Sequence, residues 1–344
     1  MAKFETRRIG RTAVAVTSFG LGCATLGGRR VTVTAEDAEA IVHAAWAEGV
    51  RYVDCAPYYG FGQAERAVGD ALREKPRDAW VLSTKVGRLL RPLRDPAAVG
   101  HQHPMPFTAV FDYSYDGVMR SFEDSLQRLG LGRIDILYVH DIGAMEHGRD
   151  AHPALMRTLR EGGWRALEEL RRAGVVRAIG LGVNEREVLM EVLDWGDWDV
   201  FLLAGRYTLL EQAPLDDLFP QCERRGISIV IGGPFNSGLL AGRDTWNYAP
   251  APEKLKARAQ AIREICERYG VPLPAAALQF PLAHPVVAAV IPGPRNVDEF
   301  ETNVKLLAHP IPAALWADLR AAGLLHPEAP TPADNVVPVV LDTP

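Results

Sequence analysis

Short apolar runs alternate with longer amphipathic segments along most of the chain. The runs are rich in β-branched residues and are bounded by turn-forming residues, a pattern typical of buried parallel strands. We therefore expect strands at residues 18–22, 51–54, 80–85, 134–140, 178–183, 200–203, 227–231 and 286–291.

The segments between these runs repeat their apolar positions with the period of a helix. Glycines such as Gly49, Gly130 and Gly226 follow several of them. Glycine readily takes the left-handed conformation that ends a helix. The first segment also opens with a capping pattern at Thr34. The expected helices span residues 34–48, 63–73, 114–129, 164–173, 185–193, 215–224, 252–269 and 297–307.

Eight strand–helix units predict an α/β fold with parallel strands and right-handed crossovers. An open doubly wound sheet is the rival of a closed (β/α)8 TIM barrel. Eight units without a strong break favour the barrel, and 344 residues suit one barrel domain with additions. We predict a single domain over residues 1–344, with its barrel core at 7–307 and a C-terminal extension at 308–344. That extension would hold a short helix at 312–322 and a proline-rich tail.

Three further segments do not follow the repeat. Residues 4–8 and 13–17 flank a Gly-Arg-Thr turn, which predicts an N-terminal hairpin that plugs the N-terminal mouth of the barrel. Residues 87–108 and 141–161 are long and polar and follow the third and fourth strands. We expect them to be loops of the substrate site, although disorder explains residues 100–106 equally well.

Composition narrows the possible partners. The net charge is −5 with 24% charged residues and no block of one sign, which argues against nucleic-acid and membrane partners. No apolar run is long enough to span a bilayer, and no secretory pattern begins the chain. The cysteines lack the CxxC spacing of zinc and dithiol sites. We expect a cytoplasmic monomer or small homo-oligomer that acts on a small molecule.

Polar residues stand at the carboxyl ends of several expected strands. Asp54, Lys85 and His140 end three of them, and Asn184 and Tyr207 follow two others. In a barrel these ends meet at one mouth, where catalytic groups lie. One such residue alone would more simply cap a strand, but three complementary groups favour an active site.

The chemistry of these groups suits proton transfer. An aspartate stabilises a buried lysine, and the ammonium group lowers the pKa of a neighbouring tyrosine. Such a tyrosine exchanges a proton with an alcohol or carbonyl, while a histidine orients the substrate oxygen. No Ser-His-Asp arrangement accompanies them. Only Asp54 and His140 could serve a metal-dependent hydrolase, so we expect no metal.

The segment Asp54-Cys-Ala-Pro-Tyr-Tyr-Gly60, continued by Glu65-Arg-Ala-Val-Gly69, resembles a motif of the aldo-keto reductases. Lys85 and His140 follow in that family's order. The resemblance implies a nicotinamide-dependent oxidoreductase. It makes Tyr59 the general acid/base and Lys85 the group that lowers the pKa of Tyr59. Asp54 then holds Lys85, and His140 orients the substrate oxygen. Spacing from the aspartate selects Tyr59 over Tyr58.

The resemblance also implies cofactor contacts. Asn184 resembles the asparagine that binds the carboxamide, residues 234–240 resemble the loop over the pyrophosphate, and residues 291–303 resemble the adenosine-binding segment. Val183, Ala204 and Gly232 stand where the family has serine, glutamine and an aromatic residue. The expected contacts come from Asn184, Tyr207, Gly232, Pro234, Phe235, Asn236, Ser237, Gly238, Leu239, Pro292, Gly293, Arg295, Glu299 and Asn303.

One position bears on the choice between NAD and NADP. Glu299 stands where NADP-binding members place an arginine against the 2′-phosphate. A carboxylate would repel that phosphate and could accept a ribose hydroxyl proton, which favours NAD. Arg295 could reach a phosphate and keeps NADP open.

Residues 85–92, 111–114 and 204–210 resemble the sugar-dehydrogenase branch of the family. That branch includes D-threo-aldose (L-fucose) 1-dehydrogenases, L-galactose dehydrogenases and pyridoxal 4-dehydrogenases. It implies the NAD(P)-dependent oxidation of an aldose hemiacetal to its lactone. Loop candidates for binding the substrate, each equally explained as a solvated residue, are Arg88, His103, Arg206 and Trp246.

Other functions fit parts of the same pattern. Within the fold, an NADPH-dependent aldehyde or ketone reductase and a pyridoxal 4-dehydrogenase are alternatives. A nucleotide-binding redox sensor with little turnover belongs to another class, and the intact set of four residues argues against it. The glycine-rich residues 20–28 lack G-x-G-x-x-G, because the sixth position is Thr25. We interpret these glycines as making room for cofactor or substrate at the barrel mouth.

Overall fold

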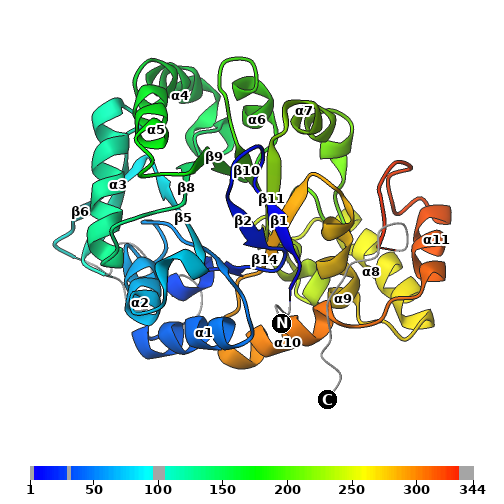
Figure 1. Ribbon diagram of the computed structural model, residues 1–344. Coiled ribbons are helices and arrows are strands. Elements are labelled where there is room, and N and C mark those ends of the chain that lie inside the picture. The colour runs from blue at the N-terminus through cyan, green and yellow to red at the C-terminus, as the bar shows by residue number, and fades with distance from the viewer. Residues whose placement is uncertain (1–3, 29–31, 96–104, 333–344) are drawn as a thin grey trace.

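A computed structural model describes residues 4–28, 32–95 and 105–332 of the chain. Its central sheet has eight parallel strands, and Figure 1 looks along the barrel that they form. The sheet closes because Phe19 pairs with Val290, with Gly20 donating its N–H to the Val290 carbonyl at 3.0 Å. The predicted barrel is confirmed. Its strands, in chain order, are β3 (Leu21–Gly22), β4 (Tyr52–Asp54), β5 (Val81–Val86), β8 (Ile136–His140), β9 (Ala178–Val183), β10 (Val200–Ala204), β11 (Ser228–Gly232) and β14 (Val287–Ile291).

The predicted helices surround this barrel. The Thr34 side chain caps the first one by accepting the Asp37 N–H at 3.0 Å, while Asp37 accepts the Thr34 N–H in return. Gly130 and Gly226 end two others in the left-handed conformation, as expected. The barrel helices are α1 (Ala35–Ala47), α2 (Gln63–Leu72), α3 (Tyr115–Leu129), α5 (Trp164–Arg172), α6 (Glu187–Val192), α7 (Leu218–Arg225), α9 (Leu273–Gln279) and α10 (Val297–Leu307). The predicted helix at 252–269 forms as α8 (Glu253–Arg268), but it packs on α9 and α11 (Ala313–Ala321) at the outside (Figure 1).

The two long polar stretches are more ordered than expected. The first contains an antiparallel hairpin of β6 (Arg88–Pro92) and β7 (Phe107–Phe111). The second was predicted as a loop, and that prediction was wrong because it forms α4 (Ala144–Thr158). Gly148 and Pro153 lie inside this helix and interrupt its helical signal.

Several smaller elements complete the chain. A hairpin of β12 (Thr245–Trp246) and β13 (Ala249–Pro250) follows the seventh barrel strand. The helix α9 (Leu273–Gln279) is buried on nearly every side, so it shows no amphipathic period. The remaining short helical turns are η1 (Ala24–Gly27), η2 (Arg77–Ala79), η4 (Leu159–Gly163), η5 (Ala213–Leu215), η6 (Asn236–Ala241) and η7 (Phe280–Ala283).

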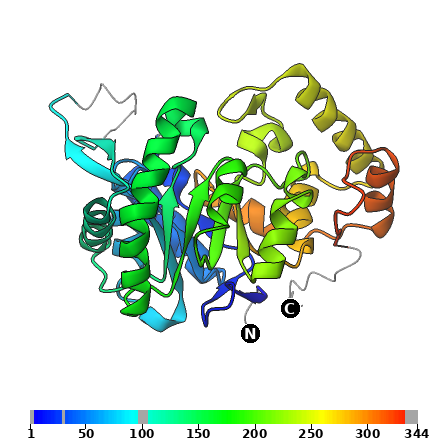
Figure 2. The same ribbon diagram turned by 90° about the horizontal axis from the view of Figure 1, so that it is seen from above.

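The N-terminal hairpin plugs the barrel as predicted. Its strands β1 (Thr6–Arg8) and β2 (Ala15–Thr17) pair antiparallel, and they lie at the edge of the barrel opposite to the β6–β7 hairpin (Figure 2). Ile9, Val14 and Val16 are buried in one cluster with the side chains that fill the barrel interior. The hairpin therefore closes one mouth and leaves the carboxyl ends of the strands as the open one.

The C-terminal extension packs on the outside of the barrel. Its helix α11 (Ala313–Ala321) buries Trp316 beside Phe280, and the Arg258 guanidinium donates to the Leu324 carbonyl at 2.6 Å. Most of the predicted proline-rich tail lies outside the described residues. Over residues 4–28, 32–95 and 105–332, no helix has both the length and the apolar character needed to cross a bilayer.

Candidate active site

Neighbouring strands bring a buried ion pair to the open mouth. The Lys85 ammonium at the end of β5 lies 2.7 Å from Asp54 Oδ2 at the end of β4. It also donates to the Cys55 carbonyl at 2.8 Å, while Ser83 Oγ donates to Asp54 Oδ1 at 2.7 Å. Both partners of the pair are almost fully buried, so their geometry is fixed by packing as well as by charge.

Tyr59 and His140 face this pair. Tyr59 lies in the turn after β4, and its ring centre is 4.7 Å from Lys85 Nζ. The rings of Tyr59 and His140 meet edge to face with centroids 6.0 Å apart. The structure therefore brings Asp54, Tyr59, Lys85 and His140 together. Strand-end positions predicted this for three of them, and the motif after Asp54 predicted it for Tyr59.

Burial governs the proton affinities of these groups. It raises the pKa of Tyr59 above its ordinary value, and the opposing effect of Lys85 does not cancel it. The lowering effect of Lys85 that we expected is present, but the sequence gives no measure of the desolvation that exceeds it. Burial and the nearby cations Arg88 and Lys85 hold the pKa of His140 well below its ordinary value, so this ring is neutral at neutral pH.

Glycines fix the position of the Tyr59 turn. A Cβ on Gly27 would lie 2.2 Å from the Gly60 nitrogen, and one on Gly22 would lie 2.6 Å from the Ile291 carbonyl oxygen. These glycines let backbone segments pack against one another. Our interpretation that they make room for a ligand was therefore wrong at Gly22 and Gly27.

Asp141 is a site residue that the sequence patterns did not reveal to us. It follows His140 directly, with a left-handed φ of 44° that is uncommon outside glycine. Its carboxylate accepts hydrogen bonds from Arg88 Nη2 at 2.7 Å and Asn184 Nδ2 at 3.1 Å, and it lies 3.3 Å from His140 Nε2. The available signal was an acidic residue immediately after a strand that ends in histidine.

Arg88 is buried rather than solvated. Its guanidinium lies 4.3 Å from the ring centre of Tyr58 and 4.8 Å from that of Phe111, and Glu146 lies 3.4 Å away on another side. Together with the hydrogen bond to Asp141, these contacts already balance the positive charge of Arg88. Arg88 therefore supports Asp141 and is not a solvated loop residue, and its assignment to the substrate site stays a prediction. His103, another such candidate, lies outside the described residues.

Arg206 and Trp246 belong to one polar cluster at the rim. Glu211 accepts a hydrogen bond from Trp246 Nε1 at 2.6 Å and lies 3.7 Å from Arg206, which also donates to Asn247 Oδ1 at 3.0 Å. Tyr248 follows on the same hairpin, near enough to Tyr59 to raise its pKa slightly. The β12–β13 hairpin thus reaches the open mouth. Glu211 was not among the residues predicted for the site.

The family is decided by comparison with known proteins. A model of the aldo/keto reductase family matches residues 18–323. This chain belongs to the aldo/keto reductase family. It is therefore an oxidoreductase, and members of its family use NAD(P)H. The predicted family is confirmed.

Relatives of this aldo/keto reductase include dehydrogenases. Pyridoxal 4-dehydrogenase of Microbacterium luteolum is 46% identical over 337 residues, covering 93% of this chain and 98% of its own. D-threo-aldose 1-dehydrogenase of a Pseudomonas species is 38% identical over 330 residues, covering 93% and 96%. The holo form of an aldo-keto reductase from Bacillus halodurans has a TM-score of 0.73 at 27% identity, covering 94% of this chain and 97% of that one.

The expected cofactor segments of this aldo/keto reductase lie side by side, because β11 and β14 are neighbouring strands. Asn236, Ser237 and Gly238 of η6 all take left-handed φ values, and the Ser237 hydroxyl accepts the Tyr248 N–H at 3.1 Å. Pro234, Phe235 and Leu239 pack around this turn with Gly232 at its start, while Pro292, Gly293 and Asn303 lie on the neighbouring β14–α10 segment.

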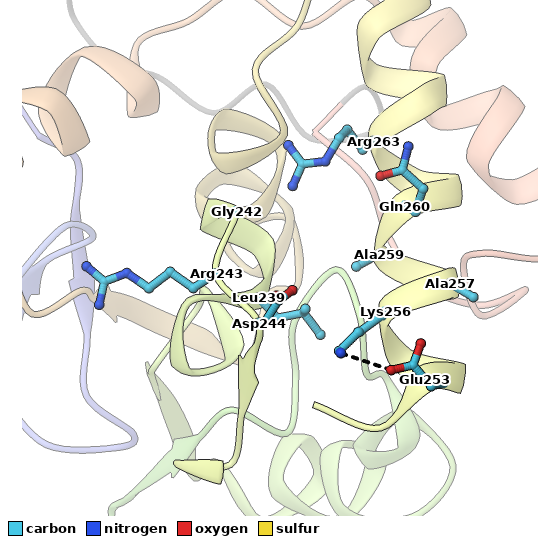
Figure 3. Close-up of a pocket in the computed structure, with 10 residues that line it drawn as sticks. All are labelled: Leu239, Gly242, Arg243, Asp244, Glu253, Lys256, Ala257, Ala259, Gln260 and Arg263. Atoms are coloured by element: carbon cyan, nitrogen blue, oxygen red, sulfur yellow. Dashed lines mark hydrogen bonds and ion pairs between the residues drawn. The ribbon is translucent and has the colours of Figure 1, made fainter. Parts of the chain in front are cut away.

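A cavity of about 570 Å³ adjoins the η6 segment and the first half of α8. Figure 3 shows Lys256 turned toward Glu253, and Arg243 extending from the other wall. Arg243 is close enough to Glu299 to contribute to lowering its pKa, so it reaches toward α10. Cationic side chains therefore accompany the segment expected to cover a pyrophosphate.

The residues present fit a dinucleotide. Asn236 Oδ1 is buried without a hydrogen-bond partner in the described part of the chain, and so is His140 Nδ1. The Asn184 amide nitrogen faces Asp141, which leaves its oxygen for an outside N–H donor such as a carboxamide. These unpartnered polar atoms suit a polar ligand along the mouth.

Tyr207 does not join the cofactor site. Its ring is fully buried and packs on Phe219, Phe280 and His284, with centroid distances of 4.5, 5.4 and 5.8 Å. This corrects its assignment as a cofactor contact, because a ligand would have to displace core side chains to reach it.

Arg295 and Glu299 form a closed pair at the expected adenosine end. Arg295 donates from its backbone N–H and from Nε to the Glu299 carboxylate, each at 2.8 Å, and a further guanidinium nitrogen contacts the same carboxylate. Burial would raise the pKa of Glu299, but these bonds outweigh it and the pKa is lowered. The charge of Arg295 is thus neutralised by Glu299 of α10.

Proposed function

We propose that this aldo/keto reductase is an NAD-dependent dehydrogenase that oxidises a cyclic hemiacetal to its lactone. The observation that carries the proposal is the ring of Tyr59 lying 4.7 Å from a lysine ammonium that Asp54 holds at 2.7 Å, with His140 on the other side. This is the arrangement of a phenol whose proton is controlled by a fixed cation.

The chain's residues divide the reaction between them. When bound, the nicotinamide supplies the acceptor for the hydride that leaves the anomeric carbon. Tyr59, as phenolate, takes the anomeric hydroxyl proton, and Lys85 stabilises that phenolate. Neutral His140 can donate one N–H to the substrate oxygen without protonating it. The C–H electron pair leaves with the hydride, and the O–H pair forms the carbonyl bond.

Two substrate classes share this hemiacetal chemistry. Aldoses are the class implied by the sugar-dehydrogenase branch, and pyridoxal is the class favoured by the relative at 46% identity, against 38% for the aldose enzyme.

A substrate panel tests the proposal. Reduction of NAD and NADP is followed with pyridoxal, L-fucose, L-galactose and D-arabinose, and NADPH oxidation is followed with simple aldehydes. We expect lactone formation from at least one hemiacetal. Rapid aldehyde reduction with no hemiacetal oxidation would replace this function with that of a carbonyl reductase.

The role of the phenol is tested by Tyr59→Phe, with Tyr58→Phe as the matched control. Loss of the hydroxyl should reduce kcat by at least about 100-fold, the usual contribution of general acid–base catalysis, with little change in NAD binding. Tyr58→Phe should keep most of the activity. If wild type and both variants bind NAD but are equally inactive, the redox-sensor alternative is favoured.

The preference for NAD rests on the Arg295–Glu299 pair, since a 2′-phosphate would meet a carboxylate and an arginine already neutralised. Glu299→Gln should free Arg295 and raise kcat/KM for NADP by about tenfold, the effect of one charged contact. Asp298→Asn, the adjacent acidic residue on α10, should leave the NAD/NADP ratio unchanged. A wild-type enzyme with much higher kcat/KM for NADP would contradict this assignment.

A further inference from the structure

Hydrogen-bond donors from two separate elements face the Asp141 carboxylate, and the His140 ring lies beside it. Arg88 Nη2 comes from β6, Asn184 Nδ2 follows β9, and His140 Nε2 ends β8. The Asp141 side chain is only 14% exposed, so water does not replace these partners freely. A site surrounded by donors requires acceptors, and a carboxylate supplies two acceptor oxygens.

The two oxygens of the Asp141 carboxylate have different partners. Oδ2 faces the Arg88 guanidinium at 2.7 Å and His140 Nε2 at 3.3 Å. Oδ1 faces the Asn184 amide at 3.1 Å. Arg88 is 3% exposed and neutralises the charge, so the carboxylate remains bound in place.

The placement of these partners determines the orientation of the Asn184 amide. An amide group has one donor end and one acceptor end, and the carboxylate must attract the donor end. The acceptor oxygen of Asn184 is then directed away from Asp141. An Asn184 amide held in this orientation can accept a hydrogen bond from the NH2 of a carboxamide. An amide without this partner would rotate between two orientations.

We propose that Asp141 is a positioning residue that fixes the amide orientation of Asn184 and thereby sets the affinity for the nicotinamide half of the cofactor. The inference rests on the proposed function, because it requires that the nicotinamide binds beside Asn184. The left-handed backbone of Asp141 suits this role, because it turns the residue back toward β9. There the Asp141 N–H donates to the Gly182 carbonyl at 3.0 Å.

Asp141→Asn tests the orientation directly. The new side chain has nearly the same shape, but one acceptor becomes a donor. The Arg88 cation retains the remaining oxygen, so the new NH2 faces Asn184 and meets its NH2. Asn184 must then rotate and present a donor to the carboxamide, which costs the complementary hydrogen bond.

The experiment measures dissociation constants of the full chain for NAD and for ADP-ribose, by quenching of tryptophan fluorescence. ADP-ribose lacks the nicotinamide and is the internal reference. For Asp141→Asn we expect NAD to bind about tenfold more weakly and ADP-ribose to bind as in wild type. The swap Asp141→Asn/Asn184→Asp returns an acceptor to face the new donor and should recover most of the NAD affinity.

The control is Asp199→Asn, which also removes a buried carboxylate. Asp199 accepts hydrogen bonds from Arg171 at 2.8 Å and from the Ile179 N–H at 2.9 Å, but it lies just before β10 at the plugged end of the barrel. This variant should leave both dissociation constants unchanged. Equal NAD affinity in Asp141→Asn and wild type overturns the positioning role, and so does an equal loss for NAD and ADP-ribose. A wild type that binds neither NAD nor NADP overturns the proposed function and this inference with it.

Discussion

At the scale of single residues, the balance between burial and charge decides the chemistry of Tyr59. Burial raises the pKa of Tyr59, while Lys85 lowers it. Asp54 and Tyr59 in turn outweigh burial at Lys85, whose pKa is raised, so the lysine stays charged. The active phenolate is therefore a minor form at neutral pH, and its population depends on this one cation.

This balance predicts the pH dependence of turnover. Oxidation needs the phenolate, whose fraction grows as pH rises toward the raised pKa of Tyr59, so kcat should increase with pH. Reduction needs the phenol and should lose rate only as pH passes that pKa. Lys85→Met removes the cation, raises the pKa of Tyr59 further and should shift the oxidation profile to higher pH, with a rate at pH 8 lower by about tenfold or more.

The control for this prediction is Lys256→Met, which removes an exposed lysine paired with Glu253 at 2.9 Å. Its pH profile should match that of wild type. An oxidation rate at pH 8 for Lys85→Met equal to that of wild type would contradict this role. An equal loss in the reduction rate, which needs the phenol, would mean that the lysine acts only through packing.

At the scale of elements, the catalytic turn depends on a neighbouring segment for its position. The turn after β4 that carries Tyr59 packs against η1, where Gly27 meets the Gly60 backbone. Backbone atoms cannot rotate aside as side chains do, so any added carbon at Gly27 must displace the turn.

Gly27→Ala should therefore lower kcat by at least about tenfold, because a small misplacement of a catalytic group is costly. It should also reduce the free energy of unfolding by about 1–3 kcal/mol, the usual cost of overpacking. Gly132→Ala is the matched control, since a Cβ there would contact nothing within 4 Å. Normal kcat in Gly27→Ala would show that the turn tolerates the shift. Steady-state kinetics and chemical denaturation provide the two measurements.

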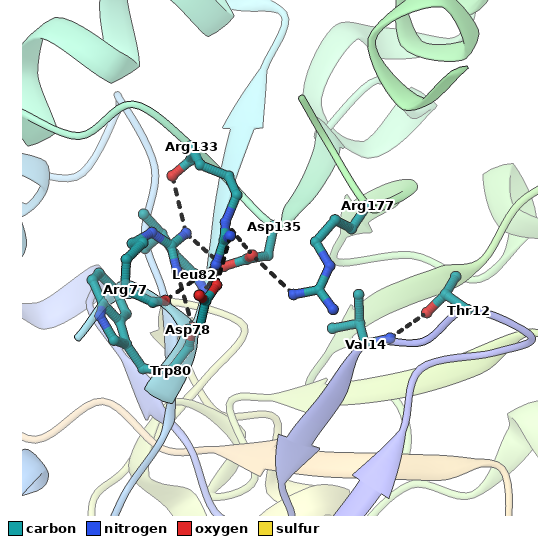
Figure 4. A network of polar contacts seen from close by, with 9 residues as sticks. All are labelled: Thr12, Val14, Arg77, Asp78, Trp80, Leu82, Arg133, Asp135 and Arg177. Atoms are coloured by element: carbon teal, nitrogen blue, oxygen red, sulfur yellow. Dashed lines mark hydrogen bonds and ion pairs between the residues drawn. The ribbon is translucent and has the colours of Figure 1, made fainter. Parts of the chain in front are cut away.

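At the scale of the whole molecule, the two ends of the barrel have separate tasks. The plugged end holds Asp135, which is fully buried and lies between Arg77, Arg133 and Arg177 (Figure 4). Its carboxylate also accepts the Leu82 N–H at 2.9 Å, so it ties the starts of two neighbouring strands. This network serves stability, whereas the open end serves chemistry.

Asp135→Asn should reduce the free energy of unfolding by about 2 kcal/mol, since three half-buried guanidinium groups lose their shared, fully buried carboxylate. NAD affinity should not change, because the network lies at the far mouth. Asp78→Asn removes an exposed partner of Arg133 and should leave the free energy of unfolding nearly unchanged. Denaturant titration of the three proteins measures the difference. Equal stability of Asp135→Asn and wild type would contradict this role.

Local sequence patterns were sufficient to predict the framework of the barrel. The alternation of apolar runs and helical periods predicted the barrel strands, and β9 spans the expected residues 178–183. The alternation failed at α4, where Gly148 and Pro153 interrupt the helical signal and Gly148, with a φ of 78°, kinks the helix. Polar residues at strand ends identified Asp54, Lys85 and His140, because strand direction alone sends such residues to one mouth.

The sequence by itself therefore determined the barrel, its hairpin plug and the set of residues that meet at Tyr59, since each follows from periodicity, strand polarity or a local motif. Only the tertiary structure decided that Arg88 is buried against Asp141, that Tyr207 belongs to the core and that burial outweighs Lys85 at Tyr59. Desolvation and the matching of donors to acceptors depend on residues far apart in the chain, and these become neighbours only when the barrel closes.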